Sequence, residues 1–184
     1  MFRTLGTSLA VVLLAAAAAP SPSPLERPPL AFPRIKEAGG IAVLPEAFYQ
    51  PKAGTKVVFD IAVGAKPDEI NKGLDRIARL INLHAGHGVP ADGPQIVAVL
   101  HGSATDASLS DEAYKIRTGA AANPNLPLLR RFNECGVKLY VCGQTLAQKR
   151  ISPNDVAPHL EIAVSAMLVN VQSQADGFAV LAVQ

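Results

Sequence analysis

The feature that most constrains the fold is a series of short, mostly apolar, β-branched segments separated by stretches with helical periodicity. The clearest are Lys56–Val63 (KVVFDIAV), Gln95–Leu100 (QIVAVL) and Val137–Val141 (VKLYV). Strands that are apolar on both faces are typical of parallel sheets covered by helices. A helical pattern opens at Pro67–Asp68 after the first segment, and Asn125–Pro127 is typical of another helix start. This order predicts a parallel sheet with helices on both faces and right-handed crossovers.

The C-terminal part of the chain extends the same alternation. Leu160–Ala175 is apolar enough to be one buried helix or a strand that runs into a helix. We predict a strand and then a helix, because Gly177 and the strand-like Phe178–Val183 then complete a regular β/α order. The predicted fold class is α/β, three layers with a five-stranded, mostly parallel sheet.

The N-terminal region is typical of an exported protein. Met1–Ala19 combines Arg3 with a short apolar run that ends in alanines, which predicts a signal peptide too short to span a bilayer. Residues 20–55 are expected to form a Pro-rich linker and an N-terminal extension, and residues 56–184 the domain. Whether Ile41–Tyr49 packs on the domain stays open. We expect a periplasmic location and no membrane attachment after signal removal.

Composition excludes several function classes. The net charge is +2 without a Lys/Arg run, so we expect no nucleic-acid partner. Neither of the glycine-rich phosphate-binding motifs follows the first predicted strand, which disfavours nucleotides. His84 and His87 have helical spacing but no apparent third metal ligand. The expectation is therefore no metal and no other cofactor.

Cys142 is the first candidate for chemistry, because it ends the third predicted strand, and ligands of such sheets bind at the carboxyl ends of strands. Gly143 and Gln144 follow it and offer donors to a thiolate, while Lys149 and Arg150 offer positive charge. The alternatives are a small buried hydrophobic residue for Cys142 and a solvated surface pair for the two cations. From the residues alone, both interpretations of Cys142 stay open, whereas the solvated surface pair is favoured for Lys149 and Arg150.

One further residue, His101, completes the expected site, and Cys135 is expected to belong to the core instead. Cys135 has helical spacing from Leu129 and Phe132, which predicts a buried thiol, whereas Cys142 is expected to be partly exposed and too distant for a disulfide. His101 ends the second strand and faces the same crevice as an acid, base or anion partner. If the strand order is 2-1-3-4-5, one strand separates His101 from the Cys142 strand.

The segment Gly136–Cys142 (GVKLYVC) and Lys149–Ile151, together with His101-Gly102 and the turn Ala175–Gly177, resemble the DsrE/DsrF-like sulfur relay family. The chain is similar to a secreted member over most of residues 56–184. The resemblance implies a flavodoxin-like three-layer α/β/α fold, a homo-oligomer (trimer or hexamer) and a persulfide on Cys142.

Two functions compete at this point. The first is a periplasmic sulfur carrier, in which Cys142 accepts sulfane sulfur from one partner and passes it to another, with Gly143, Gln144 and Lys149 stabilising the anion. The second is a non-catalytic oligomeric module that binds a small anion in the same crevice, lined by Cys142. Exposure of Cys142 is the property that we expect to discriminate between them.

Overall fold

The computed structural model describes residues 28–90 and 93–183. The predicted signal peptide, Met1–Ala19, and the first part of the Pro-rich segment lie outside the described residues. Within the described ranges, no helix is long and apolar enough to cross a membrane.

A five-stranded sheet forms the middle layer, and every pair of neighbouring strands is parallel. The strands lie in the order β4-β3-β2-β1-β5. This confirms the predicted α/β class and the interpretation of residues 160–175 as a strand followed by a helix. In chain order the strands are β1 (Lys56–Ile61), β2 (Gln95–Leu100), β3 (Lys138–Cys142), β4 (Glu161–Ala163) and β5 (Ala179–Val183).

The strand order corrects one expectation. In the order 2-1-3-4-5, β1 would separate β2 from β3, but the two pair directly from Val97↔Lys138 to Leu100↔Val141. The chain adds β2, β3 and β4 successively on one side of β1 and then returns to place β5 on the other side. The carboxyl ends of β2 and β3, where His101 and Cys142 lie, are therefore adjacent.

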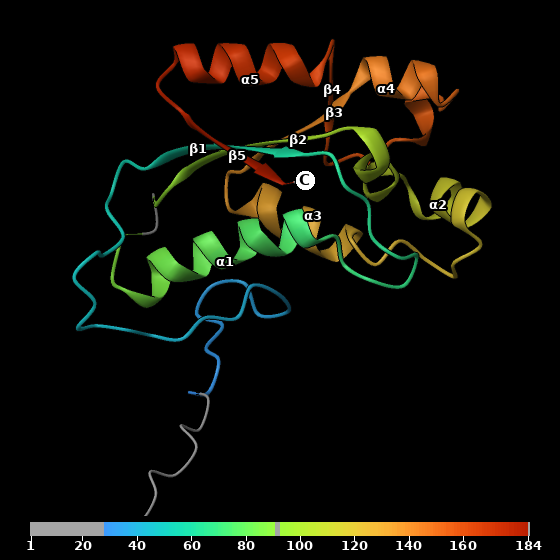
Figure 1. Cartoon of the computed structure of the whole chain (residues 1–184). Coiled ribbons are helices and arrows are strands. Elements are labelled where there is room, and N and C mark those ends of the chain that lie inside the picture. Colours follow the sequence, from blue (N-terminus) through green and yellow to red (C-terminus); the bar gives the residue numbers. More distant parts are fainter. Residues whose placement is uncertain (1–27, 91–92, 184) are drawn as a thin grey trace, which may run out of the picture.

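Helices cover both faces of the sheet (Figure 1). One face carries α1 and α3, and the other carries α4 and α5, while α2 lies beyond the carboxyl ends of the strands. The first helix begins at Lys72 rather than at Pro67, because the Asn71 side chain accepts a hydrogen bond from the N–H of Gly73 and so caps it. The helices are α1 (Lys72–Gly86), α2 (Asp111–Thr118), α3 (Leu126–Glu134), α4 (Gly143–Gln148) and α5 (Ala166–Ala175).

The alternation of side chains along the strands divides the interior into a large core and a small one. The large core, on the α1 and α3 side, contains Phe59 and Phe132, both essentially inaccessible to solvent. The small core, under α5, consists of Val99, Cys142 and Ala166, with Tyr140 and Val169 packed against it. Cys142 thus lies in the thinner of the two interior layers.

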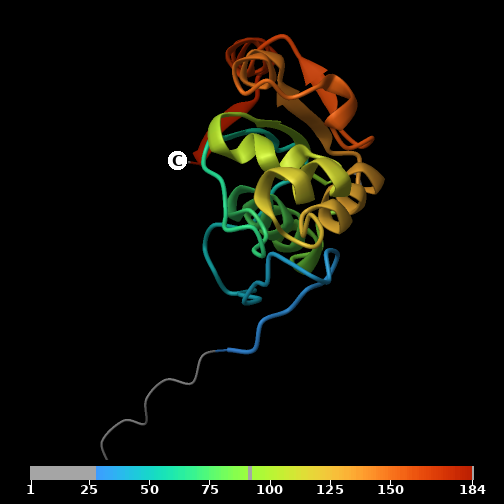
Figure 2. The same ribbon diagram turned by 90° about the vertical axis from the view of Figure 1, so that its right-hand side faces the viewer.

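An N-terminal arm, residues 28–50, lies on the side of α1 that faces away from the sheet (Figure 2). Ile35 and Ile41 are buried, so this part of the extension packs on the domain. The fully buried side chain of Asn82 holds it: Oδ1 accepts from the N–H groups of Arg34 and Ile35 at 2.9 and 2.7 Å. Its Nδ2 donates to the carbonyls of Ile35, Ala38 and Gly39.

We predict that Asn82→Ala lowers the free energy of unfolding by about 3 kcal/mol, because buried backbone groups of the arm lose their partners. Urea unfolding followed by circular dichroism measures the change. Asn133→Ala, at an exposed position of α3, is the matched control and should stay within about 0.5 kcal/mol of the native chain. Equal stability of the two variants would show that the arm contributes nothing to the fold.

Candidate functional site

Cys142 is the last residue of β3 and the N-cap of α4. Its exposed fraction is only 5%, whereas Cys135 is half-buried, so the predicted exposure of the two thiols was wrong in both cases. Cys142 is covered because Ala166, at the start of α5, packs over the end of β3. Cys135 is more open because α3 ends at Glu134, so helical spacing no longer directs the thiol inward.

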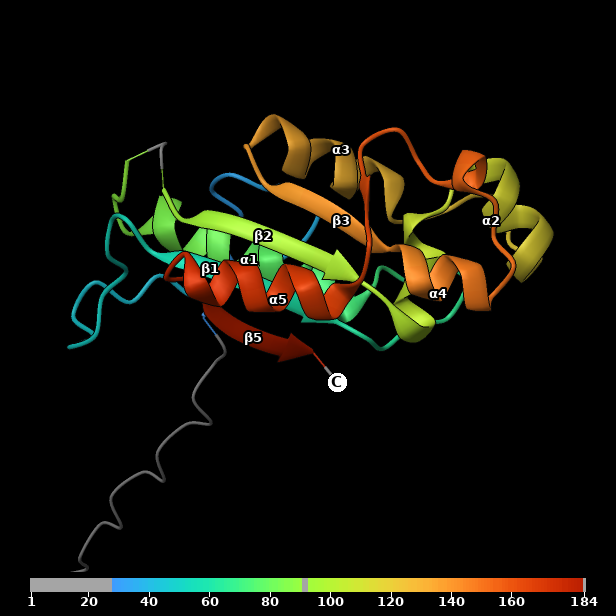
Figure 3. The same cartoon turned by 90° about the horizontal axis from the view of Figure 1, so that it is seen from above.

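The Cys142 sulfur lies among hydrogen-bond donors where two helices begin. Burial raises the pKa of the thiol, but four donors favour the thiolate and together lower the pKa below its ordinary value. They are the Thr145 hydroxyl and the N–H groups of Ala166, Thr145 and Gln144. Figure 3 shows the starts of α4 and α5 close together at the carboxyl end of β2. The arrangement is that of a stabilised thiolate.

Gly143 contributes space rather than a donor. A Cβ atom at this position would lie 2.9 Å from the carbonyl oxygen of Ala163 and 3.3 Å from the side chain of Ile162. The first turn of α4 therefore packs directly on β4. This close packing fixes the start of α4 beside Cys142.

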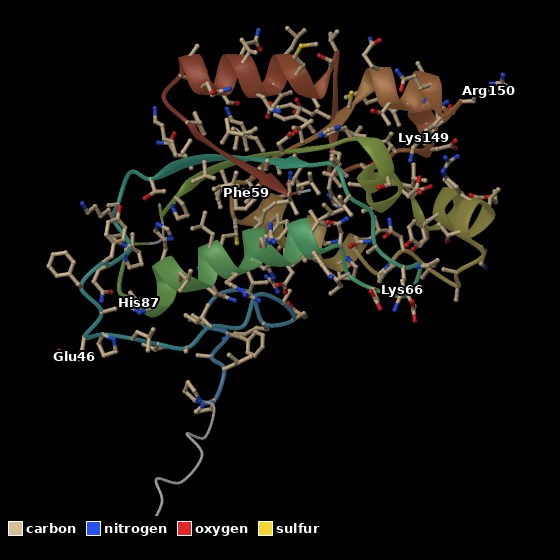
Figure 4. The ribbon with its side chains drawn as sticks, viewed as in Figure 1. Glu46, Phe59, Lys66, His87, Lys149 and Arg150 are labelled. Atoms are coloured by element: carbon tan, nitrogen blue, oxygen red, sulfur yellow. The ribbon has the colours of Figure 1, made fainter. Side chains whose placement is uncertain are left out.

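Lys149 and Arg150 lie at the far end of α4 from the sulfur (Figure 4). The Lys149 ammonium is 3.5 Å from Asp106 Oδ1, which the Arg117 guanidinium also contacts at 2.8 Å. Arg150 is exposed, with a φ of 55°. The expected positive field at Cys142 is therefore not supplied by these two residues, since one turn and a half of helix separates them from it. Hydrogen-bond donors lower the pKa instead.

His101 lies at the same edge of the sheet and has a charged neighbour that the sequence analysis did not select. Its Nε2 is 2.9 Å from Oδ1 of Asp60, the second-last residue of β1. Both atoms are buried, and their N–H···O alignment departs from that of a hydrogen bond. The sequence signal was a single carboxylate inside an otherwise apolar strand (KVVFDI). Such a group is costly to bury without a partner.

Metal ligation is not supported in the described part of the chain, which contains no cluster of three or more His, Cys, Asp or Glu side chains able to hold an ion. The chemistry that the site offers is that of a buried, hydrogen-bonded thiolate beside a carboxylate–imidazole pair. A thiolate is the nucleophilic form of cysteine.

We predict that Thr145→Val raises the pKa of Cys142, because the isosteric side chain removes the hydroxyl donor while burial stays the same. Thiolate absorbance in the ultraviolet, measured against pH in a Cys135→Ser background, reports the titration. Thr118→Val, which removes a hydroxyl bonded to a helix carbonyl in α2, is the control and should leave the curve unchanged. An unchanged curve in Thr145→Val would contradict the donor role of this hydroxyl.

Comparison with known proteins gives a fold and a family. The protein of unknown function MTH1491 from Methanobacterium thermoautotrophicum has a similar structure, with a TM-score of 0.54 and 18% sequence identity over 70% of this chain and 99% of that one. No curated protein matches the sequence. The family model described as the DsrE/DsrF-like family matches residues 56–183. This range contains the whole sheet and the Cys142 site, and the chain therefore belongs to the DsrE/DsrF-like family.

Proposed function

We propose that this chain is a periplasmic sulfur carrier that holds sulfane sulfur as a persulfide on Cys142. The observation that supports it most directly is the set of four donors around the Cys142 sulfur. They favour the thiolate, which is the form that attacks a sulfane sulfur atom. Family membership supports a role in sulfur relay. The periplasmic part of the proposal depends on Arg3 and the apolar run after it.

The alternative, a module that binds a small anion in the same crevice, is less well supported. A bound anion would need donors that are free to receive it. The donors at the starts of α4 and α5 instead lower the pKa of Cys142, so the thiolate itself is the anion that they favour. The geometry therefore favours chemistry at the sulfur over binding beside it.

The expected discriminator, exposure of Cys142, does not favour the carrier, because the residue is buried; burial is nevertheless compatible with a carrier of a single small atom. The thiolate attacks the outer sulfur of a persulfide R–S–SH, a new S–S bond forms at Cys142, and the old S–S bond breaks to release the thiol R–SH. The sulfur atom keeps its oxidation state, so no oxidant or reductant is consumed. The outer sulfur then lies about 2 Å beyond Cys142 Sγ.

We predict that the native chain gains one labile sulfur when it is incubated with glutathione persulfide. Intact-mass analysis before and after reduction measures the gain. It should persist in Cys135→Ser and be lost in Cys142→Ser, because only Cys142 has the donor set that stabilises the charged sulfur. A bulky maleimide should show the opposite preference and modify the half-buried Cys135 first. Loss of the gained sulfur in Cys135→Ser alone would contradict the assignment.

The outer face of α5 supports self-association of the chain, which is expected to form a trimer or hexamer, although a contact of this face with itself accounts only for pairs of copies. No charged residue occurs from Ile162 to Ala175. Val164, Met167 and Val171 are exposed there to 69%, 71% and 56%. A second copy of this chain presents the same uncharged apolar surface, so a symmetric contact needs no charge complement. We propose that copies meet through this face.

We predict that Met167→Lys shifts the chain toward a monomer, because the contact would have to bury a charge without a partner. Light scattering coupled to gel filtration measures the mass. Ile116→Lys, at an exposed apolar position of α2 away from this face, is the control and should leave the mass unchanged. A monomeric native chain would exclude self-association through α5.

A further inference from the structure

We propose that Asp60 and His101 form a proton-carrying pair for sulfur transfer at Cys142, with His101 exchanging the proton and Asp60 positioning the imidazole. The inference depends on the proposed function, since it names the group that supplies a proton to the leaving thiolate. The observation that supports it is the 2.9 Å contact between Asp60 and His101 on the face of the sheet that carries the thiol.

The strand register places His101 beside Cys142. The last pair of the β2–β3 ladder is Leu100↔Val141, and His101 and Cys142 are the next residue of each strand. His101 is extended, with φ −149° and ψ −174°, and its N–H donates to the Ile61 carbonyl at 2.9 Å. The strand thus continues through His101. Neighbouring parallel strands lie about 4.8 Å apart, so the two residues are adjacent at one edge of the sheet.

The same register brings Asp60 to this face. Asp60 pairs with Val99, whose side chain packs with Cys142 under α5. Because side chains alternate along a strand, Asp60, Val99 and His101 share one face of the sheet. Asp60 Oδ1 and His101 Nε2 have no hydrogen-bond partner among the described residues, and the two atoms lie 2.9 Å apart.

The contact selects one ring nitrogen of His101. The carboxylate lies 2.9 Å from Nε2 and favours a proton on that atom through its charge, although the alignment is not that of a hydrogen bond, so Nδ1 is left to accept or donate a second proton. The His101 side chain is 27% exposed and Cys142 only 5%, so the imidazole is the more accessible of the two groups to solvent protons. A carboxylate that orients an imidazole next to a nucleophile is the arrangement used for proton transfer in many nucleophilic enzymes.

Sulfur transfer requires a group that gives a proton to the leaving thiolate, and His101 is that group in this proposal. Cys142–S⁻ attacks the outer sulfur of R–S–SH, the S–S bond of the donor breaks, and its electron pair leaves on R–S⁻. Protonated His101 gives its Nδ1 proton to R–S⁻, which departs as R–SH. The new Cys142–S–SH then returns a proton to His101 and remains as Cys142–S–S⁻. Sulfur is transferred without net oxidation, and the proton moves from the persulfide to the leaving thiol.

The test compares two sulfur donors that differ in the need for a proton. Glutathione persulfide releases a basic thiolate, whereas benzenethiosulfonate releases a weakly basic sulfinate that needs none. His101→Gln should slow loading of Cys142 from glutathione persulfide on the order of 10²-fold, and Asp60→Asn about tenfold. Both variants should load from benzenethiosulfonate within about twofold of the native rate. His159→Gln, a half-buried histidine away from the crevice, is the matched control and should behave as the native chain.

Every other result of this experiment would contradict one specific part of the inference. Equal slowing with both donors would show that the pair only supports the fold, and unchanged rates with glutathione persulfide would exclude a proton role. Failure of the native chain to load from either donor would overturn the proposed function itself. Nitrogen NMR of His101 gives a readout independent of sulfur transfer: in the neutral imidazole the single proton should reside on Nε2, and a neutral ring with its proton on Nδ1 would contradict the pair.

Discussion

The in-register pairing of the three central parallel strands is the constraint on which the rest of the structure depends. It aligns Phe59, Ala98 and Leu139 on the face covered by α1 and α3, and Asp60 and Val99 on the face covered by α5. A slip of one residue in β1 would turn Asp60 into the large apolar core and Phe59 out of it. The fold and the candidate site are therefore specified by the same alternation, since the carboxylate is tolerated only on the thin, partly open side.

The face of the sheet that carries Asp60 and Val99 is covered by α5, which comes from the C-terminal part of the chain. Ser165 caps α5 by accepting from the N–H of Leu168, which fixes the first turn of the helix over the end of β3. The N–H of Ala166 can then donate to the Cys142 sulfur. Donors from α4 and α5 converge on one atom because both helices begin at the carboxyl edge of the sheet. That edge is where ligands and reactive groups of such folds are commonly found.

Structural features that depend on neighbouring residues could be predicted from the sequence. Features that depend on packing between distant parts of the chain could not. The strands, the Ser110 cap and the helix after Leu160 follow from periodicity and capping residues close by. The strand order depends on which edge of the growing sheet each crossover reaches, and no local pattern encodes this. The burial of Cys142 depends likewise on Ala166 and the α5 crossover. Asp60 was the one visible signal that was missed, a carboxylate within an apolar strand.

The donors that lower the pKa of Cys142 also couple its charge to the packing of α5. In the folded chain the thiol ionises at a lower pH than in the unfolded chain. The thiolate therefore contributes stability that is fully present above the unfolded-state pKa and is lost as the pH falls through the folded-state value. Protonation weakens the bond from the Ala166 N–H, and with it one of the contacts that hold the start of α5 against β3. The cover over the sulfur is consequently firmest when the sulfur is charged, which is the state that a stored persulfide shares.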